Sequence, residues 1–444
     1  MEVTLYQILE ARERRAEEQR RLLARFGLPL ICFTMNIAGP VKTDPLIRRS
    51  FRWGCRALEA RLTGVAFREI REDVTGCQAM YAVEGEPQTL KAICTALEEE
   101  IPLGRLFDMD VLDTRGRKLE RTELGGSSRG CIVCGAPGRG CAARRLHSVT
   151  DLQKATRSLM RAHFAREDAA HIAALAAESL REEVNTTPKP GLVDRRNSGS
   201  HRDMDIRTFF ASAGALEPYF RDCFAIGTET ASLLPEQTFF RLRQAGLEAE
   251  QAMFRATGGV NTHKGAIYTM GILCGALGRL WMPERPVGDI PTLLEEAAAL
   301  GRGALDSDFR NPPTTAGERL YRERGMTGIR GEVAAGLPAV TAWSLPVFRE
   351  ALAEGRSHNE AGVMALLHLI ARVEDTNLYH RGGPEGAAWA KAAAAALLPS
   401  PEMSRVEDLD EAFIARNLSP GGCADLLAVT WFLHMLEMWQ RAGI

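Results

Sequence analysis

Residues 30–62 read LICFTMNIAGPVKTDPLIRRSFRWGCRALEARL, and this stretch contains the signals of a strand, a loop and a helix in succession. The apolar run at 30–37 predicts a buried strand. Asp44 followed by Pro45 is typical of a helix N-cap and the first helical position. The helix predicted over 45–62 carries an apolar stripe formed by Ile47, Phe51, Leu58 and Leu62.

The residues that follow continue the alternation of strands and helices. Strands are predicted at 65–70 and 77–83 with a turn at 72–76 between them, and another at 106–112. A helix is predicted at 87–100, so the order is β-α-β-β-α-β, the split βαβ or ferredoxin-like plan. The N-terminal part is therefore expected to be an α+β domain.

From about residue 152 the sequence is rich in Ala and Leu at helical spacing. Helices are predicted at 171–184, 265–281, 291–300, 360–373 and 423–439. No convincing set of strands is present, which predicts an all-α domain of roughly ten helices. We place the two domains at residues 1–160 and 161–444.

Composition excludes several classes of protein. The chain has 444 residues, 45% hydrophobic and 25% charged, with a net charge of -2. This balance argues against general nucleic-acid binding, and no apolar run is long enough to predict a membrane span. The N-terminus lacks the apolar core of a signal peptide, and the ten cysteines are mostly scattered singly. A cytoplasmic protein without nucleic-acid or membrane partners is expected.

A basic loop precedes the first helix of the predicted α+β domain. Residues 39–44 lead from a strand into that helix, and Lys42, Arg48 and Arg49 lie close to its start. Because a helix N-terminus offers free N–H groups and a positive dipole end, this pattern predicts a phosphate site. A solvated basic helix face remains the alternative.

Two aspartates occupy alternate positions of the last predicted strand. Asp108 and Asp110 share one face of that strand, because side chains two residues apart point the same way. Adjacent carboxylates favour a bound cation, and Mg²⁺ bridging a polyphosphate fits them. A polar outer face of an edge strand would give the same pattern.

A cysteine and histidine cluster follows with the spacing C-x2-C-x6-C-x5-H. Its members are Cys131, Cys134, Cys141 and His147. Three thiolates and one imidazole satisfy a closed tetrahedral Zn²⁺ site, which would be structural. A set of unrelated free thiols is the alternative.

Five polar, glycine-punctuated loops interrupt the predicted helical domain. They lie at 187–205, 253–264, 315–332, 375–381 and 417–425. Each could be only a helix cap or a turn, and the spacing of a P-loop is absent. Five such loops in one helical domain nevertheless favour a nucleotide pocket.

These motifs also carry a resemblance. The stretches TPKPGLVDRRNSGSHRDMD, MFRATGGVNTHKGAIY, GMTGIRGE, DTNLYHRGG and NLSPGGCADLLA resemble triphosphoribosyl-dephospho-CoA synthases over residues 165–444. PLICFTMNIAGPVKTDPLIRRSFRWG, IPLGRLFDMDVLD and the Cys/His cluster resemble the apo-citrate lyase phosphoribosyl-dephospho-CoA transferase over residues 20–155. The whole chain looks like the fused, bifunctional form.

The resemblance implies two consecutive reactions. ATP and 3′-dephospho-CoA would give 2′-(5″-triphosphoribosyl)-3′-dephospho-CoA and adenine. The product would then be joined to a serine of the apo acyl carrier protein (the gamma subunit) of citrate lyase, with release of pyrophosphate. The same chemistry serving malonate decarboxylase, a metal-dependent nucleotide hydrolase and a nucleic-acid-binding zinc protein are the alternatives.

The resemblance also suggests roles for individual residues. Proton transfer or metal binding in the synthase is expected of Asp194, His201, Asp203, His263 and Asp375. Binding of ATP, dephospho-CoA or their phosphates is expected of Lys42, Arg48, Arg49, Lys189, Asn197, Arg255, Thr257, Gly259, Asn261, Thr262, Lys264, Arg330, Asn377 and Arg381. Asp108 and Asp110 would hold Mg²⁺ on the triphosphate.

Overall fold

The computed structural model describes residues 2–126, 130–136, 141, 144–308 and 316–442. The chain divides into two compact units, an N-terminal unit of residues 1–166 and a C-terminal unit of residues 167–444. Helix α5 (Val149–Asn185) is continuous through this division. It begins well before the helix predicted at 171–184, and Ser148 caps its start by accepting a hydrogen bond from Asp151 N–H at 3.1 Å.

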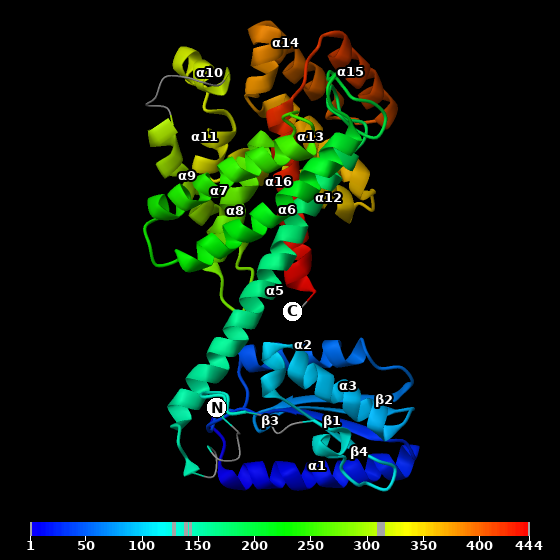
Figure 1. Ribbon diagram of the computed structural model, residues 1–444. Coiled ribbons are helices and arrows are strands. Elements are labelled where there is room, and N and C mark those ends of the chain that lie inside the picture. Colours follow the sequence, from blue (N-terminus) through cyan, green and yellow to red (C-terminus); the bar gives the residue numbers. More distant parts are fainter. Residues whose placement is uncertain (1, 127–129, 137–140, 142–143, 309–315, 443–444) are drawn as a thin grey trace. The chain divides into compact units, whose positions relative to one another are not determined.

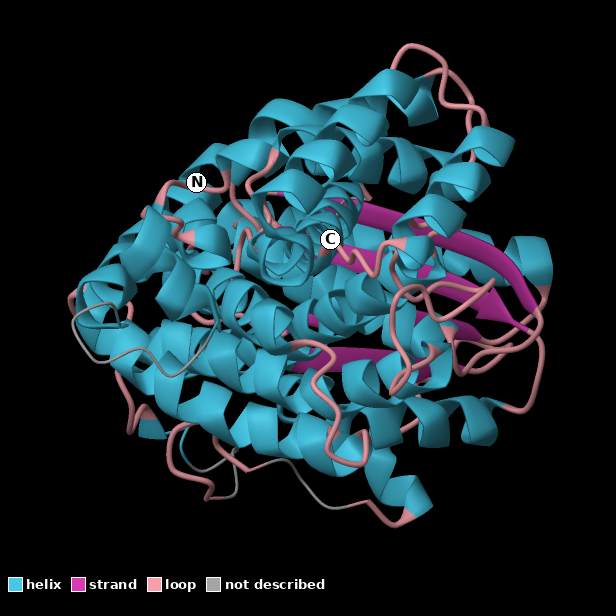
Figure 2. Ribbon diagram, turned by 90° about the horizontal axis from the view of Figure 1, so that it is seen from above, coloured by secondary structure: helices cyan, strands magenta, loops and turns pink. Residues whose placement is uncertain are grey.

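The N-terminal unit is built on one antiparallel sheet. Its strands are β1 (Leu30–Met35), β2 (Val65–Asp73), β3 (Gly76–Val83) and β4 (Phe107–Leu112). Its helices are α1 (Leu5–Phe26), α2 (Pro45–Glu59) and α3 (Pro87–Glu100), with 3-10 turns at Pro102–Leu106 and Arg121–Leu124. The strand order is β2-β3-β1-β4, and each neighbouring pair is antiparallel. Figure 2 shows the strands in magenta. The predicted β-α-β-β-α-β topology is confirmed.

Helices cover both faces of this sheet. Helices α2 and α3 lie on one face and α1 lies on the other (Figure 1). On the α2 face, the ring of Phe33 lies 4.9 Å from that of Phe51 and 5.1 Å from that of Phe107. Gly54 allows α2 to approach so closely, because a Cβ there would lie 2.6 Å from Phe33 Cζ. On the α1 face, Leu22 packs in a buried cluster that includes Cys32.

The C-terminal unit is helical throughout its described residues, as predicted. After α5 come α6 (Ile206–Glu229), α7 (Pro235–Ala256), α8 (Lys264–Leu280), α9 (Ile290–Asp308), α10 (Ala316–Arg324), α11 (Gly328–Ala334), α12 (Leu345–Ala353), α13 (His358–Arg372), α14 (Thr376–Leu397), α15 (Met403–Ala415) and α16 (Gly421–Arg441). A π-helical turn at Val340–Ser344 precedes α12. Helices α8, α13 and α16 form the centre of this unit, since about half or more of the residues in each are buried.

None of the helices in the described residues is long and apolar enough to cross a membrane. All ten cysteines are free thiols. Seven of them lie buried outside the Cys/His cluster, where they act as small apolar side chains.

Candidate functional site

The C-terminal unit contains a cavity of about 1090 Å³. All five polar loops contribute to its walls, although they are far apart in the sequence. Nine of the residues singled out from the sequence line it: Lys189, His201, Asn261, Thr262, His263, Lys264, Asp375, Asn377 and Arg381. The structure therefore brings the loops together into one pocket of a size that accommodates a nucleotide.

One wall of the cavity carries a buried ion pair. Lys189 follows α5, and its ammonium group is bonded to the Glu183 carboxylate within that helix. Burial raises the pKa of Glu183, while the charge of Lys189 opposes that rise. Because the ammonium group of Lys189 is already paired with the Glu183 carboxylate, it is not available to bind a phosphate.

Three helices begin at the cavity, and carboxylates join their first turns. Asp375 caps α14 by accepting hydrogen bonds from Asn377 N–H at 2.8 Å and Leu378 N–H at 3.2 Å. Its second oxygen accepts from Cys423 N–H of α16 at 2.8 Å. Asp425 of α16 in turn lies against Gly265 in the first turn of α8. These contacts hold the N-terminal ends of α14, α16 and α8 together, which favours negative charge in the cavity.

Asp425 is packed tightly against α8. A Cβ atom on Gly265 would lie 1.9 Å from Asp425 Oδ2, so only glycine fits at that position. Burial raises the pKa of Asp425 well above its usual range, and the neighbouring charges of Glu183 and Asp375 raise it further. These surroundings therefore favour the neutral form of the carboxyl group.

His263 precedes α8 and is buried, with 4% of the residue exposed. Its Nδ1 lies 2.7 Å from Ser212 Oγ, and Thr262 Oγ1 donates to the same hydroxyl at 2.8 Å. Nε2 is buried without a hydrogen-bond partner in the protein. Burial lowers the pKa of His263 to about 3, and the charge of Lys189 contributes to the shift. A neutral imidazole with one unused nitrogen thus lines the cavity.

His201 and Arg381 form a second polar group at the cavity wall. His201 Nε2 lies 2.9 Å from Ser419 Oγ, and its Nδ1 lies 3.3 Å from Arg381 Nη2. Arg381 also donates to Ser200 O at 3.0 Å and to Asn417 Oδ1 at 3.1 Å. Burial lowers the pKa of His201, and the guanidinium of Arg381 lowers it further. Arg381 is positioned by these contacts with part of its charge facing the cavity.

The other residues singled out in this unit do not line the cavity: Asp194, Asn197, Asp203, Arg255, Thr257, Gly259 and Arg330. Asp194 organises its own loop, accepting backbone N–H bonds from Lys189 at 2.9 Å and Arg196 at 2.7 Å. Asn197 donates to Asp410 Oδ2 at 2.7 Å. These two side chains hold the shape of the 187–205 loop, and the cavity residues of that loop depend on it.

The remaining members of that set lie at exposed or partly exposed positions. Thr257 Oγ1 donates within its turn, to Val260 O at 2.6 Å. Arg255 and Asp203 are exposed on the surface, and Gly259 is exposed in the turn. Arg330 lies within α11 and is partly exposed.

In the N-terminal unit, Asp108 and Asp110 point to the same side of β4, as predicted. Their partners across β1 are Thr34 and Cys32, which belong to the face that α1 covers. Asp108 is exposed, whereas Asp110 is partly buried and forms an ion pair with Lys118 at 2.7 Å. An incoming cation at this pair would have to displace the ammonium group of Lys118.

The basic residues around the start of α2 already have partners within the protein. Lys42 Nζ donates to Ile37 O at 2.5 Å, and burial lowers its pKa. Arg48 lies 4.0 Å from a carboxylate oxygen of Glu72. The guanidinium of Arg49 is stacked 4.0 Å over the ring of Phe164.

The N-terminus of α2 is itself capped. Asp44 Oδ1 accepts a hydrogen bond from Ile47 N–H at 2.8 Å, and its other oxygen forms an ion pair with Arg157. A carboxylate thus occupies the position where a phosphate was predicted.

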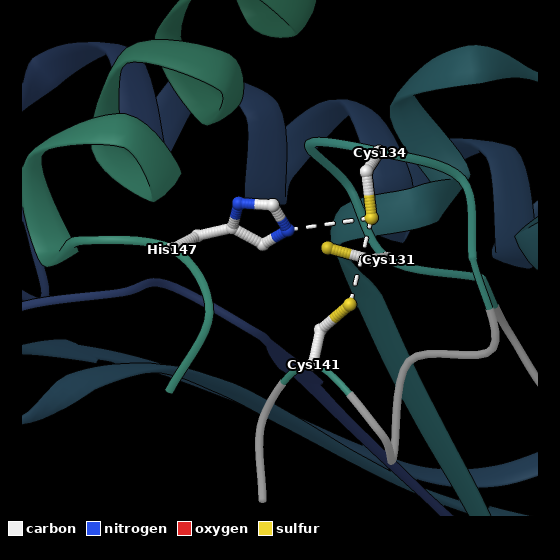
Figure 3. Close-up of side chains that lie close together, drawn as sticks. All are labelled: Cys131, Cys134, Cys141 and His147. Carbon is white, nitrogen blue, oxygen red and sulfur yellow. Dashed lines mark hydrogen bonds between the residues drawn. The ribbon is translucent and has the colours of Figure 1, made fainter. Parts of the chain in front are cut away.

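Cys131, Cys134, Cys141 and His147 converge on one point (Figure 3). Their ligand atoms all lie within 4.8 Å of one another, with Cys134 Sγ at 3.5 Å from Cys141 Sγ and at 3.3 Å from His147 Nε2. Val133 N–H points to Cys131 Sγ at 3.4 Å, a contact that favours a thiolate. The donor set fits a closed four-ligand metal centre.

Comparison with known families covers almost the entire chain. Residues 169–443 match the family of ATP:dephospho-CoA triphosphoribosyl transferases, CitG. The chain belongs to this family. Residues 3–163 match a second family, CitX, the apo-citrate lyase phosphoribosyl-dephospho-CoA transferases. The chain is therefore a CitX–CitG fusion, a transferase of citrate lyase prosthetic-group biosynthesis and attachment.

Two relatives illustrate this organisation. Protein CitXG of Haemophilus influenzae is 36% identical over 450 residues, covering 97% of this chain and 96% of that protein. The 2-(5′′-triphosphoribosyl)-3′-dephosphocoenzyme-A synthase of Pectobacterium atrosepticum is 44% identical over 264 residues, 58% of this chain and 86% of that protein. The second relative matches the CitG part alone.

Several cavity residues of the CitG part escaped the sequence-based selection. They are Glu183, Arg324, Glu332, Arg372 and Asp425. Asp425 ends the conspicuous 417–425 loop, so its position was a usable signal. Glu183 has no such signal, because it lies in an ordinary helical stretch and meets Lys189 only after the chain turns back.

Proposed function

We propose that the CitG part, in the C-terminal unit, makes 2′-(5″-triphosphoribosyl)-3′-dephospho-CoA and adenine from ATP and 3′-dephospho-CoA. The CitX part, in the N-terminal unit, then transfers this product to a serine of the citrate lyase apo acyl carrier protein and releases pyrophosphate. The observation that carries the first assignment is the single cavity formed by all five polar loops. A cytoplasmic location belongs to this proposal, and the ten cysteines without a disulfide support it.

The charged groups of the cavity walls suggest where each part of the substrates binds. Lys264, Arg372 and Arg381 contribute cationic groups to its walls. We assign the triphosphate to these groups. The carboxylates Glu183 and Asp375 repel phosphates, so the reacting ribose and the purine are assigned to their side of the cavity, which also carries Asp425.

His263 is our choice for the general base of the synthase. The ribose 2′-hydroxyl of dephospho-CoA must lose a proton as it attacks C1′ of the ATP ribose. With Nδ1–H donated to Ser212 Oγ, Nε2 carries a lone pair that has no partner in the protein. His201 and Arg381 are assigned to positioning, because their polar atoms are already joined to the loops at 200 and 417–419.

Two metal ions belong to this proposal. Zn²⁺ would be held by Cys131, Cys134, Cys141 and His147, and would tie these four side chains together as a structural site. Mg²⁺ would be held by Asp108 and Asp110 together with triphosphate oxygens, in the oxygen-rich coordination that this ion prefers. Bound there, Mg²⁺ would neutralise charge on the departing pyrophosphate.

Mass spectrometry of the full-length protein tests both halves of the proposal. With ATP and dephospho-CoA alone, adenine and the triphosphoribosyl product should accumulate in equal amounts. With the apo carrier added, the carrier should gain the prosthetic group and pyrophosphate should appear. Nucleotide hydrolysis that does not require dephospho-CoA would instead favour a metal-dependent hydrolase. If the enzyme loads a malonate decarboxylase carrier in preference to the citrate lyase carrier, the partner is the malonate decarboxylase carrier.

A further inference from the structure

Asp425 lines the cavity without a role in the steps assigned so far. It lies in the first turns of α16, faces the start of α8 and has Glu183 and Asp375 as its acidic neighbours. We infer that Asp425 is a catalytic acid, which delivers a proton to the leaving adenine in the synthase reaction. This inference rests on the proposed function of the cavity.

The position of the carboxyl group is fixed by backbone contacts. The Asp425 Oδ2 atom occupies the space that a side chain at Gly265 would need. Gly265 belongs to the first turn of α8, which directly follows His263. The carboxyl group and the imidazole of His263 are therefore held by the same turn, and both residues line the cavity.

His263 provides the independent indication of a ligand at this place. Its side chain is buried and Nε2 has no hydrogen-bond partner in the protein. A buried, unpaired ring nitrogen is costly unless a ligand pairs with it. The substrate hydroxyl is the partner that the proposed function supplies, which places the reacting centre next to Asp425.

The three carboxyl groups of this wall differ in how their charge is compensated. Asp375 accepts three backbone N–H bonds, and Glu183 is paired with Lys189. Asp425 has two acidic neighbours, Glu183 and Asp375. Of the three, Asp425 is therefore the group that best retains a proton, as an acid catalyst requires at neutral pH.

The proton and electron balance of the step is complete. The hydroxyl oxygen forms a bond to C1′ of the ATP ribose, and its proton passes to Nε2 of His263. The C1′–N9 bond breaks, its electron pair remains on the purine, and the proton of Asp425 neutralises the purine at a ring nitrogen. His263 and the Asp425 carboxylate then return to their starting states by exchanging one proton through water.

The test compares two ribosyl donors in the full-length Asp425→Asn variant. With ATP, loss of a general acid should lower kcat for adenine release by about 10²–10⁴-fold. With 7-methyladenosine 5′-triphosphate, the cationic purine leaves as a neutral molecule and needs no acid, so the variant should stay within a few-fold of wild type. Asp408→Asn, at an exposed position of α15, is the matched control and should match wild type with both donors.

Two results would overturn the inference. One is an unchanged rate with ATP, and the other is an equal loss with both donors, which would make Asp425 a binding or structural residue. If wild type does not accept the methylated donor, the pH profile with ATP decides, because only the wild type should lose kcat as the acid deprotonates at high pH. No adenine release by wild type would instead overturn the proposed function.

A second variant covers the possibility that Asp425→Asn does not fold. Gly265→Ala leaves Asp425 in the chain but introduces a Cβ where Oδ2 now lies. Displacement of the carboxyl group should produce the same donor-dependent loss. Gly246→Ala is its control, since the nearest atom to a Cβ there is Tyr219 Oη at 3.5 Å, an ordinary contact.

Discussion

Lys189 and Glu183 form an ion pair in which only 1% and 5% of the two side chains are exposed. Both residues also line the cavity of the CitG part. The pair is therefore part of the cavity wall and also contributes to the stability of the C-terminal unit. Removing one partner leaves the other charge buried without compensation, which is far more costly than losing an exposed pair.

Glu183→Gln should lower the free energy of unfolding of the C-terminal unit by about 3–5 kcal/mol. Glu229→Gln is the matched control, because its partner Arg241 is 46% exposed and Glu229 itself is 59% exposed. The control should cost about 1 kcal/mol or less. Urea unfolding followed by circular dichroism measures both, and equal losses would contradict the importance of burial.

The Cys/His cluster should bind one zinc ion per chain. Metal analysis of freshly reduced protein checks this number, and Cys134→Ser should abolish binding because it removes one of four ligands. Cys274→Ser, in the buried part of α8, is the control and should retain the metal. Chelation should destabilise the N-terminal unit more than the C-terminal unit. Zinc-free wild-type protein with full stability would refute the site.

Asp108→Ala should separate the two activities. Loss of a ligand to Mg²⁺ is expected to reduce carrier loading by about 100-fold or more. Adenine release should persist, since the residues assigned to it lie in the C-terminal unit, so the triphosphoribosyl intermediate should accumulate in solution. Glu84→Ala, at an exposed position after β3, is the control.

The outcomes for Asp108→Ala discriminate between interpretations of the carboxylate pair. Loading at the wild-type rate would show that Asp108 and Asp110 are a polar strand face, with Asp110 serving only Lys118. Loss of both activities in a folded variant would show that the two reactions share residues, and the assignment of one reaction to each unit would be wrong.

Acid should destabilise the C-terminal unit partly through His263. Its pKa is lowered to about 3 by burial, whereas an unfolded histidine titrates near pH 6.5. Below about pH 6.5 the unfolded chain therefore takes up a proton that the folded chain refuses. The stability contributed by the neutral imidazole is complete above about pH 6.5 and is lost as the pH falls towards about 3.

His263→Gln provides the measurement. The difference in unfolding free energy between wild type and variant should shrink as the pH is lowered from 6.5 to 4. Between pH 7 and 9 the difference should be constant, which serves as the internal control. A difference that does not change with pH would mean that His263 is accessible to protons in the folded state.

The sequence predicted the α+β fold well because its signals are local. Asp44 and Pro45 fix the start of α2, and Pro87 starts α3 at the predicted residue. The alternation of Ile31 and Phe33 with Leu30 and Cys32 serves two covered faces of one sheet. The early start of α5 was missed because its first turns are largely polar and carry little apolar periodicity.

Local sequence patterns did not predict which groups the charged side chains contact in the folded protein. The positive residues before and within α2 suggested a phosphate site, but Arg48 lies 4.0 Å from the carboxylate of Glu72, a residue 24 positions further along the chain. Asp194 and Asp203 attracted attention by their loop, yet only folding shows that Asp194 is used by neighbouring backbone N–H groups. Long-range pairing, unlike a cap or a strand, leaves no pattern in a single sequence.

Helix α5 also determines how the fused enzyme responds to proteases. A protease must bind extended backbone, and exposed loop tips supply it far more readily than a hydrogen-bonded helix. Because residues 149–185 are one continuous helix, the join between the CitX and CitG parts offers no such segment. Limited digestion should therefore cut loops within a unit before it separates the two, and independent halves would have to be obtained by dividing the gene.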